Sequence, residues 1–192
     1  MKKTIFCICG RSASGKDTIA NTVSEISGIP KVVSYTTRPR RDGEREDSHI
    51  FITEEEWDVL QHEDLCAYTQ IGNYYYFTTE PQIRGLLDTH GAVIYVIDPN
   101  GIRTLKHWMR DVDIVTIFIN VPIPECKKRA ERRGDDLYAL QHRFMSEAAQ
   151  FQIMCREVEY DYAVPNRDVN LACDIIAHII FRETRRAQNC AG

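Results

Sequence analysis

The chain has 192 residues, which is the size of a single domain that can bury a substantial core and carry a small insertion. Its formal net charge of −4 argues against a polycation built for nucleic acid, although basic residues cluster at 38–41 and 127–133. Seven scattered cysteines include no Cys-x-x-Cys pair, which indicates neither a disulfide framework nor a zinc site and fits a reducing cytoplasm. The apolar run at the N-terminus is too short for a membrane span and lacks a cleavage site, so we expect no membrane partner.

The chain begins with a predicted strand, a glycine loop and a predicted helix. An apolar, β-branched run at 3–9 indicates the strand, and apolar spacing over 16–27 indicates the helix. Backbone N–H groups of such a loop cradle phosphate oxygens, and Lys16 would reach the β/γ-phosphates of a nucleoside triphosphate. Asp17 stands where a Mg²⁺-binding hydroxyl normally follows the lysine, and a carboxylate is also a suitable Mg²⁺ ligand. The predicted ATP-binding residues are Gly10, Arg11, Ser12, Ala13, Ser14, Gly15, Lys16, Asp17 and Thr18.

Strands and helices alternate through most of the remaining chain. The pattern predicts strands at 29–34, 91–98, 113–121 and 160–164, and helices at 99–109, 124–133, 137–158 and 169–181. Strands separated by helices pair in parallel, so we expect an α/β fold with a five-stranded parallel sheet flanked by helices. The polar tail at 183–192 is expected to fray.

Residues 34–88 interrupt this alternation and predict a small mixed insertion on a core formed by 1–33 and 89–182. Short β-like runs at 49–52, 66–71 and 74–78 are separated by turn signals. Two capping boxes predict helix starts, one from Thr53 with Glu56 and the other from Thr79 with Gln82.

The start of this insertion combines arginines with hydroxyl groups. The guanidinium groups of Arg38 and Arg41 are suited to grip a phosphate with paired hydrogen bonds. Together with the glycine loop upstream, the run resembles the guanylate kinase family, whose pattern here is Ser-x-Thr-Thr-Arg-x-x-Arg-x-Gly-Glu. The positions that fill it are Ser34, Thr36, Thr37, Arg38, Arg41, Gly43 and Glu44.

Further segments carry the same resemblance over about residues 3–182. They are 72–78, 97–101, 129–134 with Arg143, and 160–166. The resemblance implies a P-loop NTPase fold with a helical lid at about 129–145. It also implies transfer of the ATP γ-phosphate to GMP, dGMP or a related monophosphate, with Mg²⁺ as cofactor and small-molecule nucleotides as partners.

The resemblance assigns roles by position. Lys16, Arg129, Arg133 and Arg143 would act on the transferred phosphoryl group. Asp17 departs from the family, which has a hydroxyl there, and its place in the metal site is expected from its carboxylate. The acceptor would contact Ser34, Arg38, Arg41, His49, Tyr76, Thr78 and Asp98. Asp98 also suits a simpler role as the cap of the following helix.

Some positions depart from the family pattern and leave alternatives open. His49 replaces a phosphate-binding tyrosine, and Val96 replaces an acidic residue. Ala67 falls where the family has a glutamate that reads guanine, and alanine accepts no hydrogen bond, which removes about 1–3 kcal/mol of discrimination. A kinase for another phosphorylated acceptor, such as ribose 1,5-bisphosphate, therefore remains an alternative. An inactive, protein-binding guanylate-kinase-like domain is less favoured, because Lys16 and the lid arginines are retained.

Overall fold

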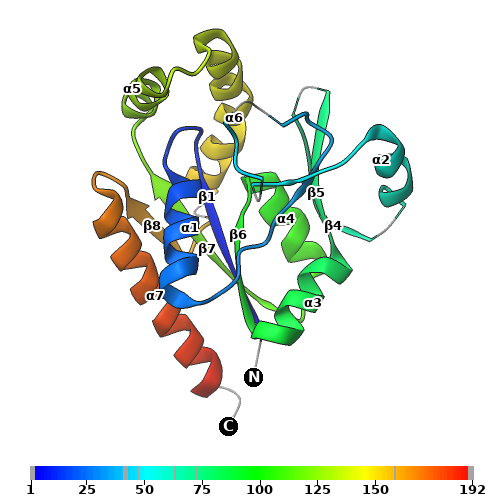
Figure 1. The fold of residues 1–192 in the computed structure, drawn as a ribbon. Helices are drawn as coiled ribbons and strands as arrows, with labels where there is room; N and C mark the ends of the chain where they lie inside the picture. The colour runs from blue at the N-terminus through cyan, green and yellow to red at the C-terminus, as the bar shows by residue number, and fades with distance from the viewer. Residues whose placement is uncertain are drawn as a thin grey trace.

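A parallel sheet forms the centre of the molecule (Figure 1). The computed structural model describes residues 3–40, 43–46, 48–62, 64–71, 73–157 and 159–189. The strand order is β6-β1-β7-β8, and every neighbouring pair is parallel. The strands are β1 (Thr4–Gly10), β6 (Ala92–Val96), β7 (Asp113–Asn120) and β8 (Tyr162–Pro165).

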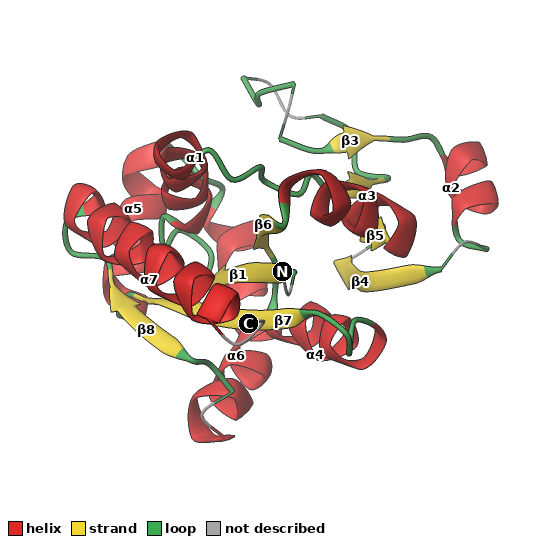
Figure 2. Ribbon diagram, turned by 90° about the horizontal axis from the view of Figure 1, so that it is seen from below, coloured by secondary structure: helices red, strands yellow, loops and turns green. Residues whose placement is uncertain are grey.

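Helices cover both faces of this sheet, as the view along it shows (Figure 2). They are α1 (Lys16–Ser27), α3 (Glu80–His90), α4 (Pro99–Trp108), α5 (Ile123–Arg133), α6 (Leu137–Glu157) and α7 (Val169–Asn189). Phe6 and Ile8 of β1 pack in one core cluster with α1 and α7. Cys7 and Cys9 alternate to the other face and pack with α3 and α4, so both thiols are buried on the same side of the strand.

A second, mixed sheet lies beside the β6 edge, at the right of Figure 1. Its order is β3-β2-β5-β4, with β2 (Tyr35–Thr36), β3 (Ile50–Phe51), β4 (Leu65–Ile71) and β5 (Tyr74–Thr79). The short helix α2 (Glu54–Leu60) has no buried residue and starts at the complete capping box of Thr53 and Glu56. Trp57 fastens this helix to the sheet by stacking on Tyr75 at a ring-centroid distance of 4.4 Å.

The prediction of a five-stranded parallel sheet is wrong by one strand. The run at 29–34 makes only a single bridge, between Lys31 and Ile94. Ile94 donates to the Pro30 carbonyl and accepts from Val32, but Pro30 has no N–H with which to extend the ladder. Ser34 then accepts a hydrogen bond from Ile50, which draws the chain into the second sheet.

Two predicted helix ends also differ from the structure. The predicted end of the last helix at residue 181 is wrong, because α7 continues to Asn189. The expected fraying of the polar tail stays a prediction. Glu183 supports this last part of the helix by accepting a hydrogen bond from Tyr162 at 2.5 Å. At α3, Thr79 caps the helix as predicted, but Gln82 donates to the Val33 carbonyl instead of closing a capping box. Within the described ranges, no helix combines the length and apolarity that a bilayer span requires.

Candidate active site

The loop between β1 and α1 has the conformation of a phosphate-binding loop. Gly15 adopts a left-handed conformation with φ of 87° as the N-cap of α1. A Cβ atom at this position would lie 2.6 Å from Asn166 Nδ2, so the approach of Asn166 requires glycine here. Ala13 also has a positive φ of 60°, which is unusual for a residue with a side chain. The loop therefore leads its backbone into the N-terminus of α1, where anions are favoured.

Lys16 and Asp17 place opposite charges at the mouth of this loop. Lys16 Nζ lies 3.1 Å from Asp17 Oδ2, and the Asp17 side chain is 72% exposed. Asp17 raises the pKa of Lys16, which burial and the nearby positive charge of Arg143 lower in part. Lys16 in turn holds the pKa of Asp17 below its usual value. Both groups are thus charged at neutral pH, and Arg143 lies close enough to act on the same lysine.

Arg129 and Asn166 support the loop through its backbone. Arg129 donates to the carbonyls of Asn166 at 2.7 Å and Ser14 at 3.4 Å. The buried Asn166 side chain donates to the same Ser14 carbonyl at 2.7 Å. Arg129 therefore contacts the loop, and its action on the transferred phosphoryl group stays a prediction. Asn166 was not among the predicted site residues, although it ends the family-like segment at 160–166.

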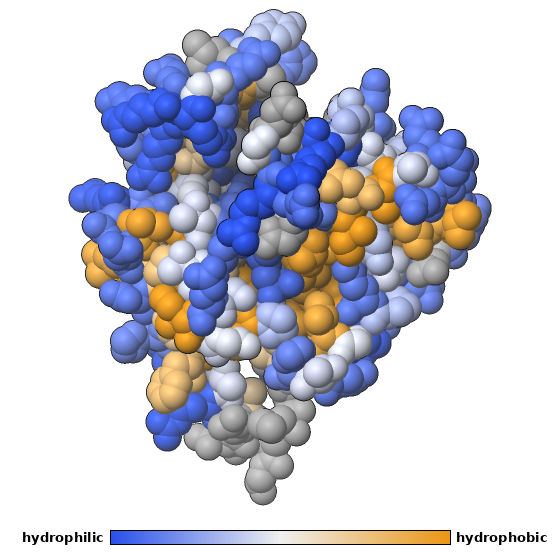
Figure 3. Space-filling model, in the orientation of Figure 1, coloured by the Kyte–Doolittle hydropathy of each residue, from blue (hydrophilic) through white to orange (hydrophobic). Residues whose placement is uncertain are grey.

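The other residues predicted to bind ATP or to act on its phosphates are spread over different parts of the structure. Arg133 pairs with Asp135 beyond the end of α5, and its side chain is 62% exposed. The Arg11 guanidinium lies 4.9 Å from the ring centroid of Phe151, against α6. Thr18 is exposed on the first turn of α1. The surface over α5, at the upper left of Figure 3, is almost continuously hydrophilic.

A second cationic cluster lies on the mixed sheet. Arg38 is only 7% exposed, donates from Nε to the Tyr76 hydroxyl at 3.0 Å, and pairs with Glu44 at 2.7 Å. His49 packs edge-on against Tyr76 at a centroid distance of 5.7 Å. Burial and the Arg38 charge hold the pKa of His49 below its usual value, so His49 is neutral at pH 7. The predicted group of Arg38, His49 and Tyr76 is thus brought together, whereas Arg41 lies outside the described residues.

The predicted base-contacting hydroxyls meet a tyrosine from β6. Tyr95 shares a 2.8 Å hydrogen bond with Thr78 and accepts one from Ser34 at 3.4 Å. Thr78 is fully buried, and burial raises the pKa of Tyr95. Tyr95 was not predicted as a site residue, because its place in an apolar strand gives no local sign of this contact.

Asp98 has two partners within the protein. One carboxylate oxygen accepts from the Gly101 N–H at 2.9 Å and caps α4, which confirms the simpler role considered for this residue. The other accepts from the Thr69 hydroxyl at 2.5 Å. Ala67, two positions before Thr69 on β4, is 2% exposed and packs in the core.

Comparison with known proteins decides the family. A family model described as guanylate kinase matches residues 2–183. Guanylate kinases from Rhizobium johnstonii and Mesorhizobium japonicum are 32% and 34% identical to this chain. Their alignments cover 95% and 94% of this chain and 83% and 84% of those proteins. The chain belongs to the guanylate kinase family.

The architecture agrees with this membership. The crystal structure of guanylate kinase from Anaplasma phagocytophilum superposes with a TM-score of 0.70 at 25% identity, covering 95% of this chain and 86% of that one. Guanylate kinases are ATP-dependent phosphotransferases, and the parallel sheet with a phosphate loop after β1 is their P-loop fold. The predictions of fold class and enzyme class are therefore confirmed.

Proposed function

We propose that this member of the guanylate kinase family transfers the ATP γ-phosphate to GMP, dGMP or a related nucleoside monophosphate. The observation that carries the proposal is the presence of two separate cationic sites. One surrounds Lys16 at the phosphate loop, and the other joins Arg38 to Tyr76 on the mixed sheet. Phosphoryl transfer between two phosphorylated substrates needs one anion site for each.

The residues of these two sites suit the chemistry of this transfer. A phosphate oxygen of the acceptor attacks the γ-phosphorus, and the bond from that phosphorus to the ADP oxygen breaks. Lys16 and Arg143 would neutralise charge on the transferred group, while Arg129 supports the loop. Arg38, Tyr76 and His49, with Arg41, would hold the acceptor phosphate. The attacking phosphate oxygen is already ionised, so no general base is required.

Asp17 fits a Mg²⁺ ion that arrives with the nucleotide. Its carboxylate is ionised, largely exposed and beside Lys16. The described residues contain no group of three or more His, Cys, Asp or Glu side chains arranged for a metal. One protein carboxylate with phosphate oxygens and waters is a usual environment for Mg²⁺. Bound there, Mg²⁺ would supply further neutralisation of phosphate charge.

The cysteines in the described ranges are free thiols, which fits a reducing cytoplasm.

Production of ADP from ATP, GMP and Mg²⁺ tests the proposal directly. We expect Lys16→Ala to lower kcat about 10²–10³-fold, because one charge contact to the transferred group is lost. Lys106→Ala, an exposed change on α4, serves as the control and should retain activity. A folded Lys16→Ala enzyme with near wild-type turnover would remove the phosphate loop from the mechanism.

A further inference from the structure

A carboxylate on helix α6 accepts hydrogen bonds from the phosphate loop. Glu147 of α6 accepts two hydrogen bonds from Ser12, one from its backbone N–H at 3.1 Å and one from its hydroxyl at 2.6 Å. Ser12 is buried and lies between Gly10 and Lys16, within the loop. A carboxylate that accepts from a loop amide and an adjacent hydroxyl makes the contacts expected of a phosphate oxygen.

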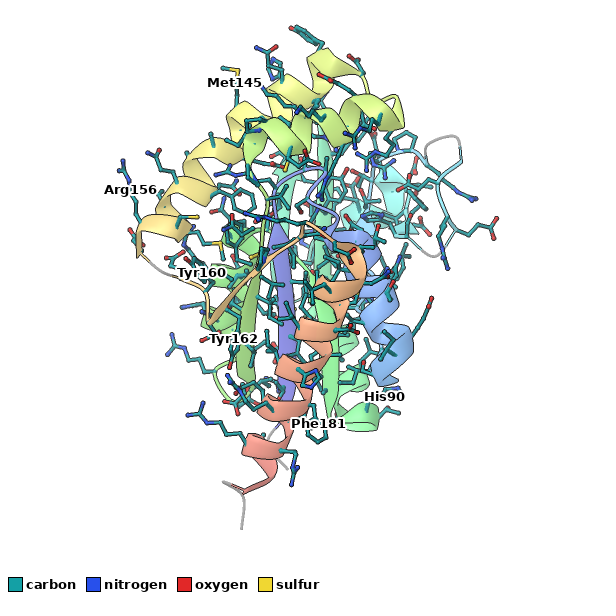
Figure 4. All side chains as sticks on the ribbon, turned by 90° about the vertical axis from the view of Figure 1, so that its left-hand side faces the viewer. His90, Met145, Arg156, Tyr160, Tyr162 and Phe181 are labelled. Atoms are coloured by element: carbon teal, nitrogen blue, oxygen red, sulfur yellow. The ribbon has the colours of Figure 1, made fainter. Side chains whose placement is uncertain are left out.

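The surroundings of Glu147 tie this contact to the site. Its negative charge adds to that of Asp17 in raising the pKa of Lys16. Arg143 lies one helical turn earlier on α6 and acts on the same lysine. Met145 and Arg156 project outward from α6, away from the sheet (Figure 4). The Glu147 contact therefore joins the inner side of α6 to the loop.

We propose that Glu147 occupies part of the nucleotide-phosphate site and that ATP binding displaces it. The inference rests on the proposed function, because it takes the loop at residues 10–18 as the ATP site. A bound phosphate and the Glu147 carboxylate would repel each other, so Ser12 cannot serve both. Glu147 thus lowers the affinity for ATP, and its release uncouples α6 from the loop when the nucleotide arrives.

Glu147→Gln tests the negative charge of this side chain while keeping its size and shape. Glutamine keeps an oxygen that accepts from Ser12, but it removes the negative charge beside the loop. We expect the Kd of ATP, measured by calorimetry at low ionic strength, to fall about 5–10-fold. Inorganic tripolyphosphate should show the same gain, because the effect concerns phosphate and not the base. The KM of GMP should stay within about twofold of the wild type.

The control is Glu157→Gln, which makes the same charge change ten residues further along α6 at an exposed position. It should leave the Kd of ATP unchanged.

The outcomes distinguish this inference from the proposed function. Tighter binding of ATP and tripolyphosphate by Glu147→Gln, but not by Glu157→Gln, supports it. Unchanged or weaker binding by a folded Glu147→Gln protein overturns it and makes Glu147 a support of the loop. A wild-type protein that binds neither ATP nor tripolyphosphate would overturn the proposed function and, with it, the displacement of Glu147.

Discussion

Carboxylates accompany the main cations of the candidate site. Asp17 lies beside Lys16, Glu44 beside Arg38, and Asp135 beside Arg133. Each carboxylate offsets the positive charge of its neighbour, so the clustered cations are stable without a bound phosphate. An incoming phosphate must then compete with a carboxylate or share the cation with it. The affinity of each site for phosphate therefore depends on the carboxylates as much as on the cations.

Asp17 offers a test of this dependence. We expect Asp17→Asn to raise the half-saturating Mg²⁺ concentration about 5–10-fold, because the amide is a weaker ligand and carries no charge. The KM of ATP at saturating Mg²⁺ should change less. Initial rates over a Mg²⁺ series would measure both quantities, with Asp174→Asn on the exposed side of α7 as the control. An unchanged Mg²⁺ requirement would limit Asp17 to its ion pair with Lys16.

His49 makes the stability of the acceptor region depend on pH. Burial and Arg38 depress its pKa in the folded protein below the unfolded value of 6.5. Its contribution to stability is therefore fully present above pH 6.5 and is lost as the pH falls through the folded pKa. We expect the free energy of unfolding, measured with urea, to fall more steeply on acidification in the wild type than in His49→Gln. Parallel curves for the two proteins would show that His49 is protonated equally in both states.

At the level of elements, the strand–loop–helix unit at the N-terminus is predictable from local chemistry. The apolar run gives β1, and the two glycines at its end and at the α1 N-cap give the loop. The missing fifth strand and the longer α7 are not predictable in this way. They depend on Ile50 pairing with Ser34 and on Tyr162 bonding to Glu183, which are tertiary contacts.

The same limit applies to the candidate site. The cations and hydroxyls stand in recognisable motifs, so they could be predicted. Glu147 contacts Ser12 across 135 positions of sequence, and Asn166 contacts Ser14 across 152. A helical pattern shows that Glu147 is on α6 but not which loop it meets. The contacts of Tyr95 are not predictable either. A strand pattern shows that its side chain is buried, but not that its hydroxyl meets those of Ser34 and Thr78.

Among the described residues, Trp57 makes the aromatic contacts between helix α2 and the mixed sheet, so its contribution to stability can be tested. Trp57 stacks on Tyr75 and lies 4.9 Å from the ring centroid of Phe77, while α2 has no buried residue. We expect Trp57→Ala to lower the free energy of unfolding by about 2–3 kcal/mol through lost aromatic packing. Val59→Ala on the same helix should cost less than about 0.5 kcal/mol, because Val59 is 69% exposed. Equal losses in urea unfolding would assign the attachment of α2 to other contacts.

Across the whole molecule, the two sheets divide recognition between them. The parallel sheet carries the phosphate loop, and the mixed sheet carries Arg38 and Tyr76. Helix α4 connects them, because it follows β6 and packs against β4. The groups nearest this junction already have protein partners: Thr78 bonds to Tyr95, and Asp98 bonds to Thr69. In the proposed reaction the acceptor phosphate would thus be met by a cationic cluster, whereas the base would meet hydroxyls and a carboxylate that already have protein partners.

This division predicts weak selection of the acceptor base. Ala67 offers no hydrogen bond, and losing two such bonds to a neutral base edge is worth about 1–3 kcal/mol. We therefore expect the preference in kcat/KM for GMP over AMP or CMP to be about 5–150-fold smaller than in a guanylate kinase that carries the glutamate. Thr69→Val removes the hydroxyl that holds Asp98. It should further lower the ratio of kcat/KM for GMP to that for AMP or CMP, with little change in the KM of ATP.

The decisive measurement is kcat/KM for GMP, IMP, AMP and CMP with the wild type and Thr69→Val. IMP lacks the 2-amino group of GMP, so the ratio between these two isolates the contact to that group. A wild-type preference for GMP above about 10⁴-fold would contradict the prediction, because Ser34, Thr78 and Asp98 would then suffice to read guanine. Turnover of no nucleoside monophosphate, with ATP binding intact, would also contradict the prediction. It would favour one of two alternatives for the cluster around Arg38, either a phosphorylated sugar as acceptor or a protein-binding role without phosphoryl transfer.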